Sequence, residues 1–214
     1  MKTGSSLAIA SMMAALAVPA HADTATLINA GFENSWTSVA SSGSDGYVVF
    51  NYGPSGPNMG WTFTGGGGVA ASYTYLHAYE GSRFALLQLQ SGLSQSFNLA
   101  SASPTTTLDF ALALRPGYRS GQTVSVFIDG VEKATYSASS TAWTLEHANL
   151  GNLTAGSHLL AFKGNAVYTT TGDTTAYLDA VKINVSPVPE PETYAMMMAG
   201  LSLLGFMARP KKAA

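Results

Sequence analysis

Short runs in which apolar and polar residues alternate constrain the fold of this chain more than any other feature. In TTLDFALALRP, residues 106–116, every second residue from Leu108 to Leu114 is a large apolar side chain. Successive side chains of a β-strand point to opposite sides of the sheet, so an alternation with period two predicts a strand with one buried face. The opposite face of this strand would carry Asp109, Ala111, Ala113 and Arg115.

A hairpin is predicted directly after this strand. In TVSVFIDGVEKATYS, residues 123–137, alternating apolar residues run up to Asp129-Gly130, and Val131 begins the return. Asp-Gly between two alternating runs is a strong indication of a two-residue hairpin turn. SHLLAFKGN at 157–165 and TTAYLDAVKINV at 174–185 predict two more strands, and RFALLQLQ and LSQSFNLA predict an earlier pair that turns around Ser91-Gly92.

Glycine- and serine-rich stretches separate these strands, and helical periodicity is almost absent. We expect loops at SSGSDG (41–46), YGPSGPNMG (52–60) and GGGG (65–68). Many short strands joined by turns, without helices between them, favour an all-β fold, specifically an antiparallel β-sandwich. The chain has 214 residues and no cysteine, so this fold would be stabilised without disulfides.

The N-terminus has the pattern of a secretory signal peptide. Lys2 precedes the apolar run SLAIASMMAALAV, which is followed by Pro19 and the small-x-small triplet Ala20-His21-Ala22. We therefore predict a signal peptide at residues 1–22, removed by signal peptidase before Asp23. The alternative, a buried N-terminal helix, would need an amphipathic stripe, whereas this run is apolar on all sides.

The C-terminus carries a second apolar segment, from Tyr194 to Ala208, with prolines before it and cations after it. As a helix this segment would cover about 22 Å, less than the roughly 30 Å hydrocarbon core of a bilayer. We expect a short or transient inner-membrane anchor whose basic end stays in the cytoplasm. The flanking residues concerned are Pro187, Pro189, Glu190, Pro191, Arg209, Lys211 and Lys212.

The C-terminal residues resemble the PEP-CTERM sorting signal of Gram-negative bacteria. The Pro-Glu-Pro motif comes first, the apolar helix with Gly200 and Gly205 follows, and the basic end comes last, as in that signal. The resemblance implies recognition of residues 187–214 by an exosortase, a membrane-embedded protease. It also implies cleavage near Pro189-Glu190-Pro191 and delivery to the cell surface or to the extracellular matrix of biofilm-forming bacteria. A permanent single-pass anchor is the alternative.

The order of motifs between the two ends resembles the jelly-roll, galactose-binding-like carbohydrate-binding modules. NAGFENSW at 29–36 resembles their opening strand, GWTF at 60–63 follows, and EGSRFALLQL at 80–89 resembles their Glu-Gly strand. The resemblance implies that residues 23–186 form a jelly-roll β-sandwich, flanked by an N-terminal signal helix and a short C-terminal hydrophobic helix.

Asp179 stands out because it has the same parity as Tyr177 and Val181 in the last predicted strand. A carboxylate on a buried face is costly unless a partner compensates it. One interpretation is a hydrogen-bonded aspartate that accepts from backbone amides. The other comes from the resemblance, which implies a structural calcium ion held by Glu33 and Asp179; Asn29 and Asp45 are further candidate ligands.

Aromatic residues are candidates for a sugar-binding surface. Sugar rings stack their C–H faces on aromatic rings, and their hydroxyls need polar partners nearby. Tyr73 and Tyr75 are expected to share one strand face, and Arg115 and Arg119 flank the turn that contains Tyr118. These five residues are our candidate ligand-binding residues, whereas Trp61 and Trp143 are expected to pack in the core.

Several function classes are disfavoured. Charged residues make up only 10% of the chain and the net charge is −2, so no nucleic-acid-binding surface is expected. His77 and Glu80 occur without an HExxH or GxSxG motif, and the remaining acidic residues are scattered. We therefore predict a non-catalytic, exported surface or matrix protein that binds polysaccharide. The alternatives are a structural or adhesive protein without a sugar ligand, and a secreted hydrolase.

Overall fold

The computed structural model describes residues 24–34, 41–44, 49–117, 121–167, 174–186 and 191–207. The chain divides into two units: residues 22–187 form one, and residues 1–21 and 188–214 belong to the other. The predicted signal peptide, with Ala20, Ala22 and Asp23 at its cleavage site, lies outside the described residues, as do Tyr118 and Arg119.

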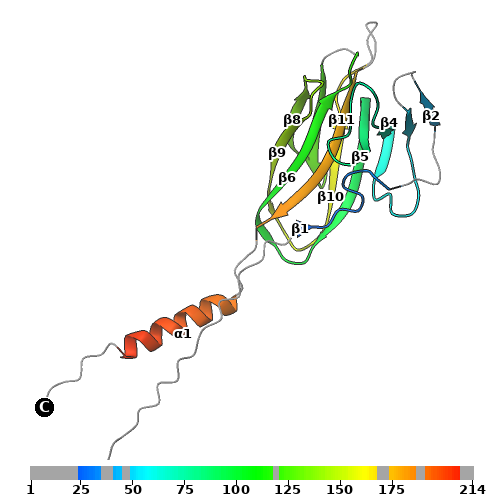
Figure 1. Ribbon diagram of the computed structural model, residues 1–214. Coiled ribbons are helices and arrows are strands. Elements are labelled where there is room, and N and C mark those ends of the chain that lie inside the picture. Colours follow the sequence, from blue (N-terminus) through cyan, green and yellow to red (C-terminus); the bar gives the residue numbers. More distant parts are fainter. Residues whose placement is uncertain are drawn as a thin grey trace, which may run out of the picture. The chain divides into compact units, whose positions relative to one another are not determined.

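The larger unit is the expected antiparallel β-sandwich of jelly-roll type (Figure 1). One layer has the hydrogen-bonded order β2-β3-β4-β5-β10-β7-β8, and the other has the order β1-β11-β6-β9. The strands are β1 Thr24–Ala25, β2 Ser41–Ser44, β3 Val49–Tyr52, β4 Thr62–Ala71, β5 Arg83–Leu99, β6 Ser103–Leu114, β7 Gln122–Ile128, β8 Val131–Ala138, β9 Thr144–Leu153, β10 Gly156–Gly164 and β11 Thr175–Val185.

The main core lies between the two layers, and β6 contributes to it as the alternation predicts. Leu108, Phe110, Leu112 and Leu114 are all buried, and the Phe110 ring lies 5.2 Å from the Phe162 ring of β10. Trp61 is only 4% exposed, which confirms the prediction that it packs in the core.

The Asp129-Gly130 hairpin is confirmed. Asp129 and Gly130 have φ angles of 51° and 80°, the left-handed values that a two-residue turn between twisted strands requires. β7 and β8 pair on either side of the turn. The Asp129 carboxylate also accepts hydrogen bonds from Leu159 N at 2.8 Å and shares one with His158 at 2.7 Å.

The predicted change of direction near Ser91-Gly92 is present, but residues 83–99 form one continuous, bent strand rather than two strands separated by a loop. β5 pairs with β11 before Leu89 and with β10 after it. Leu89 has a φ of 51°, and the β4–β5 register shifts by two residues between Gly66↔Gln88 and Thr64↔Gly92. The glycine and serine in this stretch therefore mark a bend where the two layers diverge.

The predicted loop at residues 65–68 is also wrong, because the glycine run lies inside β4. A Cβ atom on Gly68 would lie 2.1 Å from the carbonyl oxygen of Asn51 on β3. The glycines here allow backbones to approach closely, which is the second common reason for glycine in a strand. Residues 41–44, also expected to be a loop, form β2 and pair with β3.

The opening segment differs from expectation as well. Residues 28–34 form a turn rather than a strand, with φ angles of 54° at Asn29 and 60° at Phe32. The turn is closed by Phe32 N donating to the Asn29 carbonyl at 3.0 Å and by Asn34 N donating to the Asn29 side chain at 2.9 Å.

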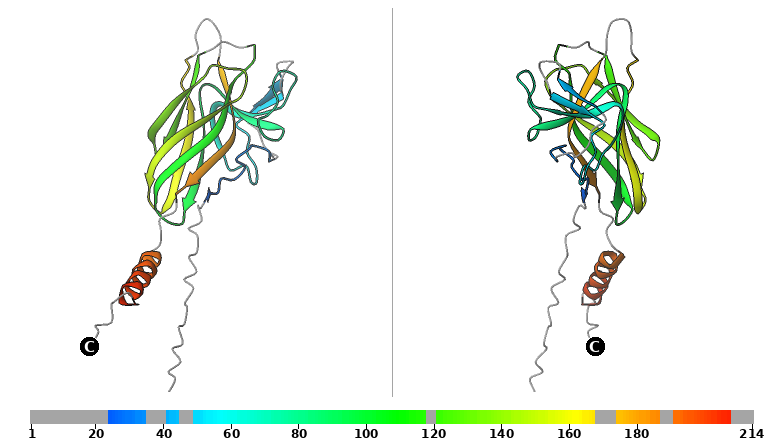
Figure 2. Two further views of the ribbon diagram at one scale, coloured as in Figure 1. Left: turned by 60° about the vertical axis from the view of Figure 1, so that its left-hand side comes forward. Right: turned by 90° about the vertical axis from the view of Figure 1, so that its right-hand side faces the viewer.

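The two ends of the sandwich domain lie side by side at one pole. Thr24 of β1 pairs with Asn184 near the end of β11 (Figure 2). β6, β8 and β10 end at the opposite pole, where β11 begins and where β5 bends between its β11-paired and β10-paired halves. β5 begins beyond the Leu178↔Ala85 pair and β4 ends beside it, so the connection between β4 and β5, residues 72–82, lies beside the middle of β11, where Glu80 N reaches Asp179.

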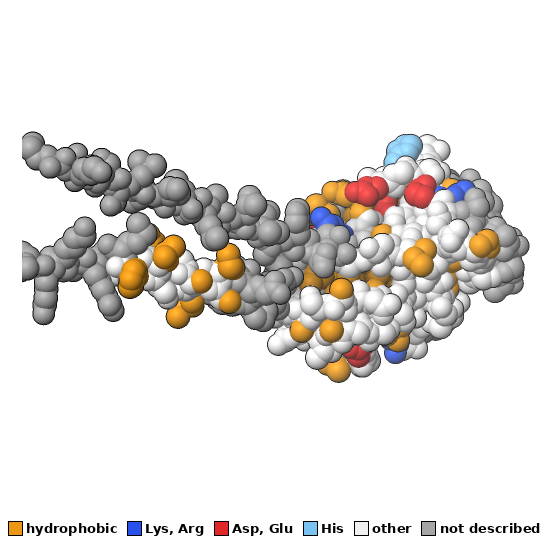
Figure 3. Space-filling model, turned by 90° about the horizontal axis from the view of Figure 1, so that it is seen from below, with side chains coloured by type: hydrophobic (Ala, Val, Ile, Leu, Met, Phe, Trp, Pro, Cys, Tyr) orange, Lys and Arg blue, Asp and Glu red, His pale blue; other side chains and the backbone are white. Residues whose placement is uncertain are grey.

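The smaller unit contains one described helix, α1, Pro191–Met207. Its apolar side chains are exposed, with Met196 at 61% and Phe206 at 70% (Figure 3). In the part of the chain that the structure describes, no helix has the length and apolar character needed to cross a membrane. Pro191 begins α1, whereas Pro189, Glu190, Arg209, Lys211 and Lys212 lie outside the described residues.

A buried histidine links the Asp129-Gly130 turn to the start of β10. His158 is 7% exposed, with Nδ1 2.7 Å from Asp129 Oδ2 and Nε2 2.9 Å from the Thr154 carbonyl oxygen. Both partners accept hydrogen bonds, so the geometry favours the doubly protonated ring. Burial lowers the pKa of His158, but the hydrogen bonds to Asp129 and Thr154 outweigh it and hold the pKa above 6.5.

We predict that this histidine makes the domain less stable at alkaline pH. Because the folded-state pKa lies above the ordinary value of 6.5, its contribution is complete below that value and is lost as the pH rises through the folded-state pKa. Urea unfolding at a series of pH values should therefore show a falling free energy of unfolding, and His158→Leu should flatten the slope. His147, which is 71% exposed, provides the control His147→Leu. Equal slopes in the wild type and His158→Leu would contradict the prediction.

Candidate functional site

The β4–β5 connection brings the two predicted tyrosines together, although not on a strand. Tyr73 and Leu76 close a tight turn through reciprocal backbone hydrogen bonds of 2.9 and 3.2 Å, so Tyr73 and Tyr75 do not share a strand face. Their rings nevertheless meet edge to face with centroids 6.2 Å apart. Tyr75 is 60% exposed, so most of its ring faces solvent.

A second ring pair lies on the same connection and was missed as a site by sequence reasoning. Tyr79 meets Trp143, from the β8–β9 connection, at 6.3 Å edge to face, and Tyr79 is 41% exposed. Trp143 is partly buried, and its Nε1 donates to the His77 carbonyl at 2.7 Å. No sequence pattern links residues 79 and 143, which are far apart in the chain.

Both ring pairs are supported by a small hydrophobic cluster separate from the main core. Phe84 is its centre, 4.6 Å from the Tyr177 ring and 5.7 Å from the Trp143 ring. Tyr73 and Trp143 pack against this cluster. Trp143 was expected to pack in the core, and it does pack against buried residues, but those of the small cluster rather than the main core. The buried members are Ala70, Leu76, Phe84, Leu86, Ala113 and Tyr177.

Further hydrogen bonds hold the connection in shape. Ser72 N donates to the Ser82 carbonyl at 2.8 Å, and the Ser72 hydroxyl accepts from Ala78 N at 2.8 Å. We call the surface formed by Tyr73, Tyr75, Tyr79 and Trp143 the aromatic pole. Its rings are ordered by packing and by backbone hydrogen bonds, which lowers the entropic cost of binding a ligand.

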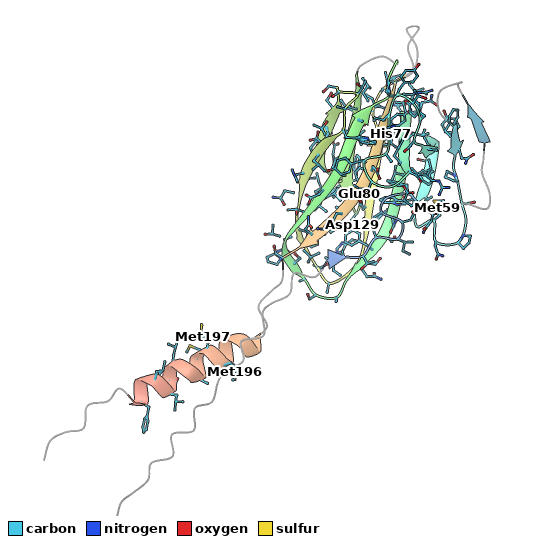
Figure 4. All side chains as sticks on the ribbon, viewed as in Figure 1. Met59, His77, Glu80, Asp129, Met196 and Met197 are labelled. Atoms are coloured by element: carbon cyan, nitrogen blue, oxygen red, sulfur yellow. The ribbon has the colours of Figure 1, made fainter. Side chains whose placement is uncertain are left out.

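The predicted arginines do not extend this surface. Arg115 is 6% exposed, and its backbone N donates to the Thr175 carbonyl at 3.1 Å. Its side chain is thus buried, and a ligand at the aromatic pole would not reach it. Figure 4 shows His77 and Glu80 on the β4–β5 connection, and no ion pair joins these two residues in the described chain.

A polar groove on the outer face of the β4-β5-β10-β7 layer is the other candidate surface. It has a volume of about 310 Å³ and is lined by hydroxyl groups, by Lys163 and by the apolar residues Phe127 and Leu159. Leu159 is 43% exposed. The groove offers hydrogen-bonding groups but only one ring on its outer face, so it is poorer in stacking surfaces than the aromatic pole.

Asp179 lies beside a β-bulge that the sequence pattern does not reveal. The β11–β6 register shifts between Asp179↔Ala111 and Lys182↔Asp109, and Ala180 has a φ of 51°. Because the bulge adds one residue to β11, alternate side chains after it point to the opposite face from those before it. Tyr177 therefore packs in the small cluster, whereas Val181 packs in the main core, and the predicted common face of these two residues is wrong.

Asp179 is completely buried and accepts hydrogen bonds from backbone amides. Ala180 N donates to Oδ1 at 2.7 Å and Glu80 N donates to Oδ2 at 3.0 Å. Burial raises the pKa of Asp179 to about 6, and the backbone N–H donors oppose this rise. The charge of Glu33 acts in the same direction as burial, so the two carboxylates are close enough to repel each other.

Glu33, from the opening turn, reaches the same connection. Its Oε1 accepts from Ser82 N at 2.9 Å and from Arg83 N at 2.7 Å, and its Oε2 accepts from the Ser82 hydroxyl at 2.8 Å. The backbone donors come from Tyr79, Glu80, Ser82, Arg83 and Ala180, and we call these N–H groups together with Glu33 and Asp179 the amide clasp. The structure thus brings the two predicted calcium ligands to one loop.

The donors around these carboxylates do not fit a calcium ion. Calcium prefers about six to eight oxygen ligands, whereas the groups that face Glu33 and Asp179 are N–H and O–H donors. Among the described residues, no three acidic or histidine side chains converge. Calcium binding by the chain stays a prediction.

Other carboxylates of the described chain each bond to their own neighbouring side chains. Asp109 bonds His147 at 2.7 Å and Asn184 at 2.8 Å on the outer face of β6. Burial acts to raise the pKa of Asp109, but these two hydrogen bonds outweigh it and hold the pKa below the usual range. Glu132 accepts from Ser125 and Thr135. These residues do not form a pair of carboxylates across a cleft.

The C-terminal segment supplies the clearest comparison with known proteins. Residues 187–212 match the PEP-CTERM protein-sorting motif. A PEP-CTERM signal implies an exported protein directed to the cell surface. No curated protein is significantly similar to the chain as a whole.

Solved structures similar to the sandwich include carbohydrate-binding modules and parts of glycan-cleaving enzymes. The module TmCBM61, in complex with β-1,4-galactotriose, is 14% identical, with 59% of this chain and 88% of that chain covered and a TM-score of 0.45. A xylan-binding domain from Paenibacillus barcinonensis is 17% identical, with 63% and 90% covered and a TM-score of 0.44. A cellotriose-bound module from Cellvibrio mixtus is 19% identical, with 51% and 83% covered and a TM-score of 0.37. Similarity at this level does not transfer a ligand or a binding site to this chain.

Proposed function

We propose that this chain is an exported surface or matrix protein whose sandwich binds polysaccharide at the aromatic pole without catalysis. The observation that carries the proposal is the two ring pairs, Tyr73 with Tyr75 and Tyr79 with Trp143, in each of which the ring named Tyr75 or Tyr79 is exposed. Exposed aromatic rings offer flat apolar surfaces for the C–H faces of sugar rings. Neighbouring polar groups, including His77 and Glu80, are available for hydroxyl groups.

The exposure of the rings supports this function. Tyr75 is 60% exposed and Tyr79 is 41% exposed, so polysaccharide in the surrounding matrix could reach both rings.

The arrangement of titratable groups supports a non-catalytic role. Hydrolysis of a glycosidic bond usually needs two carboxyl groups that flank one substrate bond at a defined separation. In the described chain Asp109, Asp129 and Asp179 each bond their own partners on different elements. A secreted hydrolase is therefore the weaker alternative.

The C-terminal segment is proposed to act as a detachable sorting signal. β11 ends at Val185, and α1 begins at Pro191, so the Pro-Glu-Pro motif lies directly between the folded domain and the apolar helix. Proline favours an extended backbone with few internal hydrogen bonds, which suits binding in a protease cleft. We propose that α1 inserts transiently in the inner membrane and that an exosortase cleaves near Pro189-Glu190-Pro191, before release to the surface or biofilm matrix.

A structural or adhesive protein without a sugar ligand is the second candidate. Leu145 and Val131 are 50% and 59% exposed, on β9 and β8, the outermost strands of their layers at one side of the sandwich. Such side chains suit packing against other matrix proteins. The candidate predicts that the mature domain binds itself or other matrix proteins, and no polysaccharide.

We predict that the exposed tyrosines carry sugar affinity. Tyr75→Ala and Tyr79→Ala should each weaken binding roughly three- to tenfold, because each removes one stacking surface. Affinity electrophoresis of the mature protein in gels containing galactan, xylan or the host's own exopolysaccharide measures the effect. Leu159→Ala, in the polar groove, is the matched control and should leave mobility unchanged. Loss of binding in Leu159→Ala alone would move the site to the groove, and no retardation of the wild type would refute sugar binding.

We also predict that sorting depends on the proline-rich motif. Pro189→Ala combined with Pro191→Ala should leave the C-terminal segment attached, because the extended backbone recognised by the protease is weakened. The intact mass of the protein recovered from its native host measures this directly. Pro187→Ala, outside the Pro-Glu-Pro triplet, is the control. A wild-type protein that keeps residues 191–207 would indicate a permanent anchor instead.

A further inference from the structure

We infer that the amide clasp joins the opening turn to the last strand without a metal ion. The residues to which the resemblance assigned a calcium ion instead share a set of backbone donors from one loop. The inference does not rest on the proposed sugar binding, because it is argued from the hydrogen bonds of Glu33 and Asp179 alone.

Every carboxylate oxygen in the clasp already accepts a hydrogen bond. In Asp179, Oδ1 accepts from Ala180 N and Oδ2 from Glu80 N; in Glu33, Oε1 accepts from two amides and Oε2 from the Ser82 hydroxyl. A carboxylate that accepts several backbone N–H bonds is stabilised in its charged form. These donors carry partial positive charge toward both carboxylates, which is the role that a cation would otherwise perform.

A permanent cation already lies beside the clasp. The Arg83 guanidinium donates to the backbone carbonyl of Glu33, and Arg83 N donates to the carboxylate of the same residue. The Glu33 carbonyl, a natural oxygen ligand for calcium, is therefore engaged with a positive group. A calcium ion at this place would have to displace the guanidinium.

The loop backbone is shaped to receive the Glu33 carboxylate. Gly81 has a φ of 67°, and a Cβ atom on it would lie 2.5 Å from Glu33 Cδ. Only glycine combines that backbone conformation with room for the carboxylate. The clasp thus depends on three elements at once: the opening turn, the Glu80-Gly81 loop and the β11 bulge.

The clasp gives this cysteine-free chain a non-covalent link between its first turn and its last strand. Val181 N donates to the Ala30 carbonyl at 3.2 Å, directly beside the Asp179 carboxylate. The same loop continues through Ser82 to Ser72, at the base of the aromatic pole. Loss of the clasp is therefore expected to loosen the opening turn and the support of the ring-bearing connection together.

Thermal unfolding of the mature chain, in millimolar calcium chloride and separately in EDTA, tests the inference. The two unfolding temperatures should agree within about 1 °C, and titration with terbium, a luminescent calcium substitute, should give no saturable signal.

Glu33→Gln should lower the unfolding temperature by roughly 3–8 °C to the same extent in both buffers, because it removes a charged acceptor from a set of backbone donors. Glu80→Gln is the matched control, since its backbone N–H remains and its side chain is exposed.

Gly81→Ala provides an independent test of the loop geometry and should destabilise the domain at least as much as Glu33→Gln, again without dependence on calcium. If Gly81→Ala does not fold, Ser82→Ala removes only the hydroxyl donor and should produce a smaller, calcium-independent loss. A rise of several degrees with calcium in the wild type, abolished by Glu33→Gln or Asp179→Asn, would overturn the inference and establish a calcium site.

Discussion

The last strand is the element on which the rest of the sandwich depends. β11 pairs with β1, β5 and β6, so it joins the start of the domain, the bent strand shared by both layers and the most strongly patterned core strand. The bulge at Ala180 lets one strand serve two hydrophobic clusters, with Tyr177 in the small cluster and Val181 in the main core. It also places the carboxylate of Asp179 where the amides of the β4–β5 connection can reach it.

The chain ends and the candidate binding residues contact different parts of β11. The chain ends lie together at one pole, where Thr24 pairs with Asn184, and the connection with Tyr75 and Tyr79 lies beside the middle of the strand. The small cluster around Phe84 packs between the last strand and the ring-bearing connection. The sorting segment follows β11 in the chain, so its removal leaves the residues of the aromatic pole in place.

The sequence predicted those features that follow from local patterns. The alternation in β6 and the Asp129-Gly130 turn were confirmed, because side-chain periodicity and φ requirements are local properties. The strand through Gly68 and the bulge at Ala180 were not predicted, because a glycine can equally mark a turn or a close approach of backbones, and a bulge leaves no residue pattern. The pairing of Tyr79 with Trp143 depends on two connections that only the folded topology brings together.

The central claim is that ligand binds at the exposed rings of the β4–β5 connection. Two-dimensional NMR of the isotopically labelled mature domain, titrated with fragments of the host's exopolysaccharide, tests it most directly. The account predicts that chemical-shift changes concentrate at residues 73–80 and 142–144. Changes that concentrate instead around Thr64 and Lys163 in the polar groove, or no changes at all, would contradict it.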